Sequence, residues 1–519
     1  MVGAGPTGLT LAVQLARYGV PVRIIDAQPA PSTFSKALGV QARTLELFER
    51  IGIAEQVIAS GIQYREVFVH SSRKLIVHES LVGIRSKYNY VLAIPQWQTE
   101  AILTERLRAL GVEVERGTQL VHLEHDAASV RVHLRGREGE TDREYPYVVG
   151  CDGAHSTVRH FAELKFTGET LTEQWALADV RLDAELPRDA VSVFLSPGNM
   201  AGVFPLPQEI TRIIIGRPSG GYGESPPIDD FRSSLYLAGA EIRSISEVLW
   251  TAQFTVNQRR VQHMQKGRLF LAGDASHIHS PVGAQGMNTG IQDVENLAWK
   301  LALALHHPEP KALLDSYGIE REQVAATLVR ATGAFTKLVA NPNPAVRAVR
   351  DRVAAIASAI PMAQDRFRDA VSELGIIYAR SPIVAYGSRT PDPKPGAHAP
   401  DGSFARAGDG TRTSVYELIA GLHFVLLVFT YRRDQFEHEL LVAMGKYNEI
   451  VDTYVVARDA SIAGAHLLDP PGAVFKAYGA DGEPQYVLIR PDGYVAARGA
   501  VRDYGSIVTL LKKISAVVV

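Results

Sequence analysis

The glycine pattern near the start of the chain most constrains what this sequence can fold into. Residues 3–8 read GAGPTG, which matches the spacing G-x-G-x-x-G. Glycines at these positions permit a tight turn and a close approach of the backbone to a pyrophosphate, which then faces the start of a helix. Residues 9–18 carry apolar side chains at helical spacing, and residues 20–25 form an apolar run that predicts a strand. We therefore assign to dinucleotide binding Gly3, Gly5, Pro6, Thr7 and Gly8.

Asp26 ends the predicted strand, 18 residues after Gly8. A carboxylate at this distance accepts hydrogen bonds from ribose hydroxyls in dinucleotide-binding folds, so Asp26 joins the predicted site. Only Met1 and Val2 precede the first glycine, whereas a strand usually has five or six residues. We expect a short central strand, and we expect that residues which would complete this strand are missing before Met1.

Length and composition exclude several classes of protein. A chain of 519 residues is long enough for two or three lobes. Its formal net charge of -2 gives no indication of a nucleic-acid partner. The single cysteine, Cys151, rules out an internal disulfide framework and predicts a cytoplasmic protein without a metal site. No signal peptide and no long uncharged apolar stretch is visible, so no membrane span is expected.

Two further segments carry the same kind of chemistry. Residues 148–159 read VVGCDGAHSTVR, and residues 268–300 read RLFLAGDASHIHSPVGAQGMNTGIQDVENLAWK. Together with GAGPTG, they resemble the three fingerprints of the FAD-dependent aromatic hydroxylases typified by p-hydroxybenzoate hydroxylase. The resemblance covers about residues 1–385. It implies an FAD monooxygenase that takes hydride from NADPH or NADH, adds O2 at flavin C4a to form a hydroperoxide, and hydroxylates a phenolic or polyketide-like aromatic.

The resemblance also implies roles for residues of the second and third segments. Asp274 would bind the ribityl chain, and Pro281 would line the isoalloxazine ring. A helix that begins near residue 287 would point its free N–H groups at the flavin N1–C2=O edge, where the reduced ring carries negative charge. The remaining residues implied in cofactor binding are Asp152, Gly153, Arg159, Gly273, Gly286, Met287 and Asn288. Relatives often have glycine where this chain has Ala284.

Weaker assignments complete the predicted site. The run SKALGVQARTLELF resembles a pyrophosphate-contacting segment, with Arg43 as the phosphate partner and Lys36 where relatives have arginine. Gln96 would lie near the flavin phosphates, with Gln98 as its rival, and Val121 would touch the adenine. No catalytic base is assigned. His277 and His279 are candidates, but each of them could instead only form hydrogen bonds within its loop. In the predicted sheet of residues 175–217, Phe194 and Phe204 lie either in a core or, with Pro205, against the substrate.

The predicted fold class is α/β with three parts. A Rossmann-like FAD-binding domain with a helical extension takes residues 1–170 and 255–385, and an inserted antiparallel sheet for substrate binding takes 171–254. A proline- and glycine-rich linker takes 386–404. Residues 405–519, through the run YVLIRPDGYVAAR, resemble the thioredoxin-like domain of phenol hydroxylase and polyketide hydroxylases. This domain has no cysteine, so a structural role or a homodimer contact is expected.

Three other functions share some of these features. A Baeyer–Villiger or epoxidising flavin monooxygenase would carry the same three segments. A flavin halogenase is disfavoured because no W-x-W-x-I-P run is present. A flavin-free binding protein would follow if the short first strand abolished cofactor binding.

Overall fold

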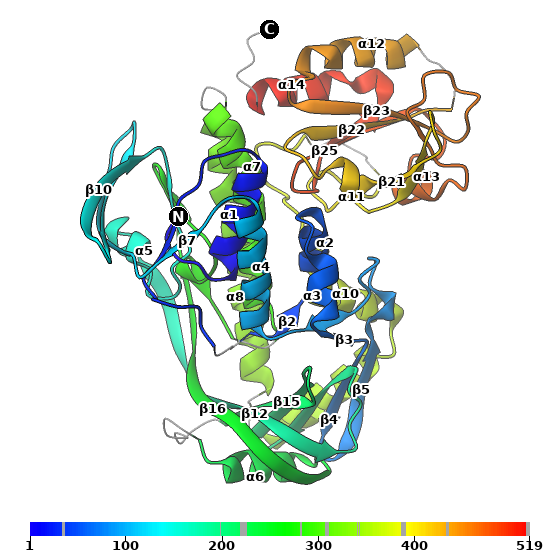
Figure 1. Cartoon of the computed structure of the whole chain (residues 1–519). Coiled ribbons are helices and arrows are strands. Elements are labelled where there is room, and N and C mark those ends of the chain that lie inside the picture. The colour runs from blue at the N-terminus through cyan, green and yellow to red at the C-terminus, as the bar shows by residue number, and fades with distance from the viewer. Residues whose placement is uncertain are drawn as a thin grey trace. The chain divides into compact units, whose positions relative to one another are not determined.

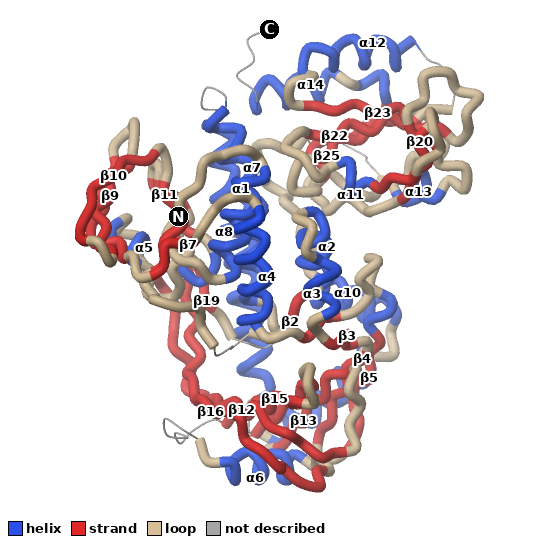
Figure 2. The backbone as a smooth tube through the Cα atoms, in the orientation of Figure 1, coloured by secondary structure: helices blue, strands red, loops and turns tan. Residues whose placement is uncertain are grey.

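The computed structural model describes the chain except residues 34–36, 198, 218–225, 281–282, 307–310, 340, 342, 386–390, 432–434 and 515–519. The chain forms two compact units (Figures 1 and 2). The first consists of Met1–Thr10, Arg23–Asp293 and Gln323–Leu374, and the second of Leu11–Val22, Val294–Glu322 and Gly375–Val519. Three helices have residues in both units: α1 (Pro6–Arg17), α7 (Gly286–His306) and α8 (Lys311–Val339).

A small parallel sheet forms the centre of the first unit. Strand β1 (Ile24–Asp26) pairs with β7 (Val114–Arg116), and β11 (Val148–Gly150) pairs with β18 (Leu269–Leu271), both in parallel. Val2 bridges β1 and β11, again in parallel, so the predicted short first strand is a single residue. The antiparallel β17 (Gln265–Lys266) closes the far edge. The residues of β11 and β18 are all buried, as expected for strands covered on both faces.

A larger sheet holds eight strands in the order β19-β16-β12-β15-β14-β13-β4-β5. Its strands are β4 (Glu66–Ser71), β5 (Lys74–Ser80), β12 (Phe166–Ala184), β13 (Ala190–Ser196), β14 (Asn199–Pro205), β15 (Ile210–Arg217), β16 (Ile242–Val261) and β19 (His277–Ile278). Strands β12 to β16 pair antiparallel, which confirms the sheet predicted from residues 175–217. Helix α6 (Ile228–Ala238) packs on one face (Figure 1), against Ala176, Phe194 and Ile213.

Smaller elements complete the first unit. Strands β2 (Gly39–Val40), β3 (Ile62–Tyr64) and β6 (Val91–Ala93) form one sheet, and β8 (Gln119–His125), β9 (Val130–Gly136) and β10 (Gly139–Tyr145) form a meander. The helices are α2 (Ala42–Arg50), α3 (Ala54–Ala59), α4 (Gln96–Ala109), α5 (Thr157–Phe161), α9 (Pro344–Ala357) and α10 (Pro361–Ser372). The expected domain limits at 170/171 and 254/255 fall inside β12 and β16.

The second unit is built on a mixed sheet in the order β21-β20-β24-β23-β22-β25-β26. Its strands are β20 (Ser403–Arg406), β21 (Arg412–Ser414), β22 (Phe424–Phe429), β23 (Val451–Ala457), β24 (Leu467–Leu468), β25 (Gln485–Ile489) and β26 (Val495–Ala500). All six residues of β22 are buried, because helices cover both faces of the sheet. Figure 1 shows α12 (Gln435–Met444) and α14 (Gly505–Ile514) on one face, with α11 (Val415–Leu418) and α13 (Ala473–Ala477) on the other. The predicted α/β fold is confirmed, and the C-terminal part is a mixed sheet with helices on both faces.

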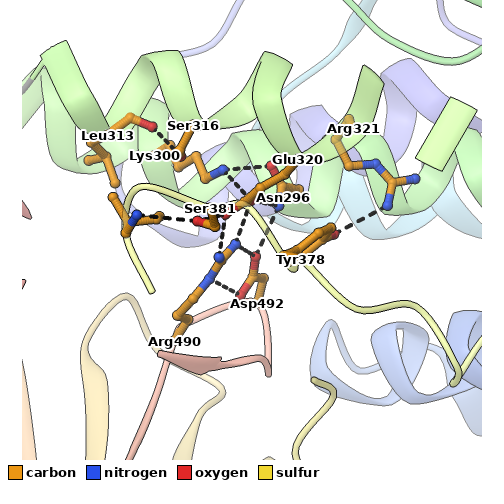
Figure 3. Close-up of polar contacts among 11 residues, drawn as sticks. Asn296, Lys300, Leu313, Ser316, Glu320, Arg321, Tyr378, Ser381, Arg490 and Asp492 are labelled. Atoms are coloured by element: carbon orange, nitrogen blue, oxygen red, sulfur yellow. Dashed lines mark hydrogen bonds and ion pairs between the residues drawn. The ribbon is translucent and has the colours of Figure 1, made fainter. Parts of the chain in front are cut away.

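A buried charge network lies inside the second unit (Figure 3). The Arg490 guanidinium donates to both carboxylate oxygens of Glu320, at 2.6 and 2.9 Å, and its Nε donates to Asp492. Lys300 donates to Glu320 at 2.7 Å, and all four side chains are at most 1% exposed. Burial alone would raise the pKa of Glu320, but Arg490 and Lys300 outweigh burial and hold that pKa below its usual range. The network joins α7 and α8 to the turn between β25 and β26.

Part of the segment predicted as a linker is ordered against this same unit. Residues 386–390 lie outside the described part of the chain. Gly396 donates its N–H to the carbonyl of Val495, and Ala399 donates to the carbonyl of Gly493. Ala399 is fully buried. Residues 396–399 therefore add backbone pairing beside β26.

Candidate functional site

The glycine turn at the start of the chain is shaped by two close backbone contacts. A Cβ on Gly3 would lie 2.4 Å from the carbonyl oxygen of Cys151, and one on Gly8 would lie 2.0 Å from the carbonyl oxygen of Gly3. Gly3 also has φ of +99°, which side chains rarely adopt. A Cβ on Gly5 would meet nothing within 4 Å. Packing within the described protein therefore explains Gly3 and Gly8 but not Gly5, whose open side is available to a ligand at the start of α1.

Asp26 fastens this turn to β1. Its Oδ2 accepts the N–H of Ala4 at 2.7 Å, and its Oδ1 accepts the N–H of Gln28 at 2.8 Å. Arg116 lies opposite Asp26 in the pairing of β1 with β7, with Nη1 3.5 Å from Oδ2. The Nη2 of Arg116 is buried without a hydrogen-bond partner among the described residues. Arg116 belongs to no sequence motif, and only the strand register brings it beside Asp26.

The second predicted segment packs directly against the first. The Cα of Asp152 would lie 2.8 Å from a Cβ on Gly3. Asp152 accepts the N–H groups of Thr157 and Val158 through Oδ2, while its buried Oδ1 has no partner among the described residues. Burial raises the pKa of Asp152, against the opposing effect of these hydrogen bonds. Gly153, with φ of +77°, makes the turn that follows.

Arg159 is held by protein contacts. Its guanidinium donates to the carbonyls of Ala275 and Ala154, at 2.8 and 2.7 Å, and lies 4.0 Å from the ring centroid of Phe166. It thereby joins the second segment to the third. These contacts give the Arg159 side chain a structural role, and its role in cofactor binding stays a prediction.

The third segment meets the first through Thr7. A Cβ on Gly273 would lie 2.7 Å from Thr7 Oγ1, and one on Gly290 would lie 2.6 Å from the same atom. Asp293 accepts the N–H of Gly273 at 3.0 Å and a hydrogen bond from His277 Nε2 at 2.7 Å. His277 is 1% exposed. The three segments therefore converge around one turn, and His277 acts within the protein as a support for the Gly273 loop.

The start of α7 is fixed by Asn288. Its Oδ1 accepts the N–H of Gln41, and its Nδ2 donates to the carbonyls of Gly39 and Ala284, all at 2.8–2.9 Å. A Cβ on Gly39 would lie 2.9 Å from the Cβ of Ala284, which itself has φ of +53°. Asn288 thus ties β2 to the first turn of α7. Gly286 and Met287, which open this helix, are partly exposed.

His279 lies beside the same helix start. Its Nδ1 donates to the carbonyl of Ser280 at 2.9 Å, and its buried Nε2 has no partner among the described residues. A Cβ on Gly286 would lie 3.7 Å from that Nε2. Burial, helped by the charge of His277, lowers the pKa of His279 to about 4. At neutral pH this imidazole is uncharged and offers a hydrogen-bond acceptor at the start of α7.

The remaining predicted residues have diverse surroundings. Arg43 is buried in α2 and pairs with Glu46 at 3.1 Å. Gln96 bonds to Glu100 and Ala37, whereas Oε1 of its rival Gln98 is buried without a partner among the described residues. Val121 is the extra residue of a β-bulge in β8, and Asp274 is exposed. Lys36 and Pro281 lie outside the described residues.

These residues fit a bound FAD. Gly5 leaves an open side at a helix start, as close approach of a pyrophosphate requires. Asp26 offers a carboxylate near that turn, and Asp152 carries a buried oxygen that needs a partner. In the described part of the chain, no cluster of side chains suits a metal ion and no helix could span a bilayer.

Comparison with known proteins gives the same assignment. Residues 1–332 match the family "FAD binding domain", and residues 392–515 match "Aromatic-ring hydroxylase, C-terminal". The 6-methylpretetramide 4-monooxygenase of Streptomyces rimosus is 35% identical over 96% of this chain and 90% of its own.

Solved structures agree over nearly the whole length. The anhydrotetracycline hydroxylase OxyS from Streptomyces rimosus has a TM-score of 0.79 at 30% identity, covering 99% of this chain and 97% of its own. Aklavinone-11 hydroxylase, solved with FAD and aklavinone, has a TM-score of 0.77 at 25% identity, covering 99% of this chain and 98% of its own. The chain therefore belongs to the family of FAD-dependent aromatic-ring hydroxylases and is a flavoprotein monooxygenase.

Proposed function

We propose that this monooxygenase hydroxylates a polycyclic, polyketide-type aromatic, with a nicotinamide nucleotide as electron donor and O2 as co-substrate. The relatives described above are named for 6-methylpretetramide, anhydrotetracycline and aklavinone. Bound FAD supplies the oxygen-transfer chemistry, and the chain holds the reactants and keeps water out. The observation that carries the proposal is the convergence of residues 3–8, 152–153 and 273–274 on one cradle.

We place the substrate against the face of the large sheet that points away from α6. Phe194 packs toward α6 and belongs to the core. On the opposite face, Trp175 lies near Phe254, with ring centroids 6.4 Å apart, and its indole ring covers Gly216. The Nε1 of Trp175 is buried without a partner among the described residues. Aromatic rings and a spare donor suit a flat molecule with keto or phenolic oxygens.

The cofactor contacts remain proposals for individual residues. We assign the pyrophosphate to Gly5 and the start of α1, a ribose to Asp26 with Arg116 beside it, and the ribityl chain to Asp274. Gly286 and Met287 would face the flavin edge. The buried positions of Arg43 and Asn288 support a role in holding this cradle in shape, beside any direct contact with FAD.

The domain scheme is likewise a proposal. Residues 1–170 with 255–385 would bind FAD, 171–254 would bind substrate, and 405–519 would serve structure or homodimer contact. A cytoplasmic location is supported by the single, buried and unpaired Cys151.

The test starts from the visible spectrum of the purified protein, where flavin bands near roughly 375 and 450 nm are expected. NADPH and NADH oxidation is then measured with polycyclic aromatics and with simple phenols. A true substrate should accelerate flavin reduction and yield a hydroxylated product that contains one oxygen atom from labelled O2. Equal, slow oxidation with every compound would contradict the proposal, and insertion of the label into a lactone would favour a Baeyer–Villiger reaction.

A variant sharpens the substrate assignment. Trp175→Phe keeps an aromatic ring but removes the indole N–H. We expect its KM for an oxygenated polycyclic substrate to rise about fivefold, which corresponds to one hydrogen bond, with unchanged flavin content. An unchanged KM would remove Trp175 from the substrate site.

A further inference from the structure

A cleft of about 640 Å³ opens in the first unit between the β12–β16 ribbon and α8. Its lining includes Arg260 of β16 together with Arg330 and Lys337 of α8. Among the lining residues that the structure describes, Glu169 is the single acidic one, and it pairs with Lys337 at 2.7 Å. The cleft is therefore basic, and its volume lies in the range of small-molecule sites.

The lining of the cleft holds a buried polar group that lacks a hydrogen-bond partner among the described residues. Gln258 is 6% exposed, and its Nε2 has no hydrogen-bond partner among the described residues. Buried amide donors are seldom left unsatisfied, so this one points to a ligand that accepts a hydrogen bond. Anionic oxygens are the strongest such acceptors.

Two glycines bring the walls of the cleft close to Gln258. Gly168 has φ of +149°, and a Cβ there would lie 1.9 Å from the carbonyl oxygen of Gln258. A Cβ on Gly333 would lie 2.3 Å from the Gln258 Oε1. Side chains at either position would displace Gln258, so this part of the lining depends on the two glycines.

The two cations on α8 differ in their pairing. Arg330 is exposed and makes no ion pair or hydrogen bond with another described residue. Lys337 shares its charge with Glu169, and both side chains are more than half exposed. Arg260 donates to the carbonyl of Val261 at 3.3 Å and keeps its charge near the cleft. The three positive charges are thus set along an open recess.

The cleft is joined to the loop that precedes α7. Thr336, next to Lys337, donates a hydrogen bond from its hydroxyl to Ser280 Oγ at 2.8 Å. Ser280 lies between His279 and the start of α7, where the flavin edge is assigned. A ligand in the cleft therefore borders the segment that leads to the flavin.

We propose that this cleft binds the phosphate groups of the nicotinamide donor, an inference that rests on the function proposed above. The donor carries a pyrophosphate, and NADPH adds a 2′-phosphate, which matches three basic side chains and a spare amide donor. An aromatic substrate is the poorer occupant, because the described lining contains no aromatic side chain. NADPH is favoured over NADH by the excess of positive charge.

Calorimetric binding of adenosine 2′,5′-bisphosphate to the FAD-loaded enzyme at low ionic strength tests the cleft directly. Replacing both cations of α8, Arg330→Ala with Lys337→Ala, should raise its Kd roughly tenfold, which is about 1.4 kcal/mol, because two exposed charges that attract the phosphates are lost. Glu169→Gln should lower the Kd about twofold to threefold, because it removes the competing anion. Arg352→Ala, an exposed arginine of α9 outside the lining, is the matched control and should change nothing.

Stopped-flow reduction of the flavin gives the second readout. In the double variant, the Kd for NADPH should rise in parallel with that for the bisphosphate, more than the Kd for NADH, while the limiting reduction rate and the KM of the aromatic substrate stay unchanged. This assignment would be overturned if the double variant bound the nucleotides as tightly as wild type. It would also be overturned if the variant lost affinity for inorganic phosphate but not for the nucleotides. Failure of both donors to reduce the wild-type flavin would instead overturn the proposed function, and this inference with it.

Discussion

At the scale of single residues, the glycines of the first turn serve two different purposes. Gly3 and Gly8 are required by backbone atoms that lie too close for a Cβ, whereas Gly5 faces open space. A substitution at Gly8 therefore acts on the fold, and a substitution at Gly5 acts on whatever occupies that space. The two positions can be separated by experiment.

We predict that Gly5→Ala leaves the stability of the flavin-free protein within about 0.5 kcal/mol of wild type but weakens FAD binding at least about tenfold, because the new methyl group fills the approach to the pyrophosphate. Thermal unfolding of the flavin-free protein and an FAD titration followed by fluorescence provide the measurements.

Gly8→Ala serves as the comparison. Its Cβ would lie 2.0 Å from the carbonyl oxygen of Gly3, so we expect a loss of about 3 kcal/mol in the absence of FAD. If Gly5→Ala bound FAD as tightly as wild type, the pyrophosphate would have to lie elsewhere.

The motif residues could be located from the sequence, but their partners could not. The spacing of GAGPTG identified the turn and Asp26 because that pattern depends on local geometry. Arg116 was missed, since its place beside Asp26 follows from the pairing of β1 with β7. Asn288 likewise accepts a hydrogen bond from Gln41, which lies almost 250 residues away in the sequence.

At the scale of elements, β2 and α7 meet at a contact with almost no spare space. Asn288 bonds across it, and the backbone of Gly39 lies against the side chain of Ala284. Ala284 has a left-handed backbone conformation, which glycine adopts with less strain than alanine.

We predict that Gly39→Ala destabilises the protein by about 1–2 kcal/mol, because its Cβ would lie 2.9 Å from that of Ala284. Ala284→Gly alone should be neutral or slightly stabilising, since it relieves the positive φ. Combined, the two changes should recover most of the loss in urea unfolding, with a coupling of about 1 kcal/mol. Strictly additive effects would show that the two residues do not share this contact.

Elements with a clear period were predicted well, and irregular ones were not. The helix after the glycine turn, α7 and β22 followed from apolar spacing, which reflects burial on one or both faces, whereas the strand predicted over residues 20–25 is observed only at Ile24–Asp26. The pairing of residues 396–399 beside β26 was not foreseen, because proline and glycine indicate turns without saying whether they pack.

At the scale of the whole chain, the network around Glu320 joins segments that are far apart in sequence. Glu320→Gln leaves Lys300 and Arg490 with too few counterions in a buried place. We predict a loss of about 3–5 kcal/mol in unfolding free energy, measured in urea. The surface pair of Asp229 with Arg232 provides the control, and Asp229→Asn should cost less than about 1 kcal/mol.

The same network predicts how stability depends on pH. Because Glu320 has a lower pKa in the folded chain than when unfolded, its stabilisation is complete above about pH 4.5 and is lost as the pH falls. The wild-type urea midpoint should therefore decline below that pH more steeply than the midpoint of Glu320→Gln. Parallel curves for the two proteins would mean that Glu320 is not held by its cations.

The bonds between Arg490 and Glu320 also bear on how such enzymes can be recombined. A chimaera that joined residues 1–385 of this enzyme to the tail of a homologue would place the two sides of this buried salt-bridge network on segments from different proteins. Unless the donor tail supplied an equivalent of Arg490, Glu320 would keep Lys300 but lose both hydrogen bonds from the guanidinium. The C-terminal region is therefore best exchanged together with residues 294–322, which belong to the same compact unit.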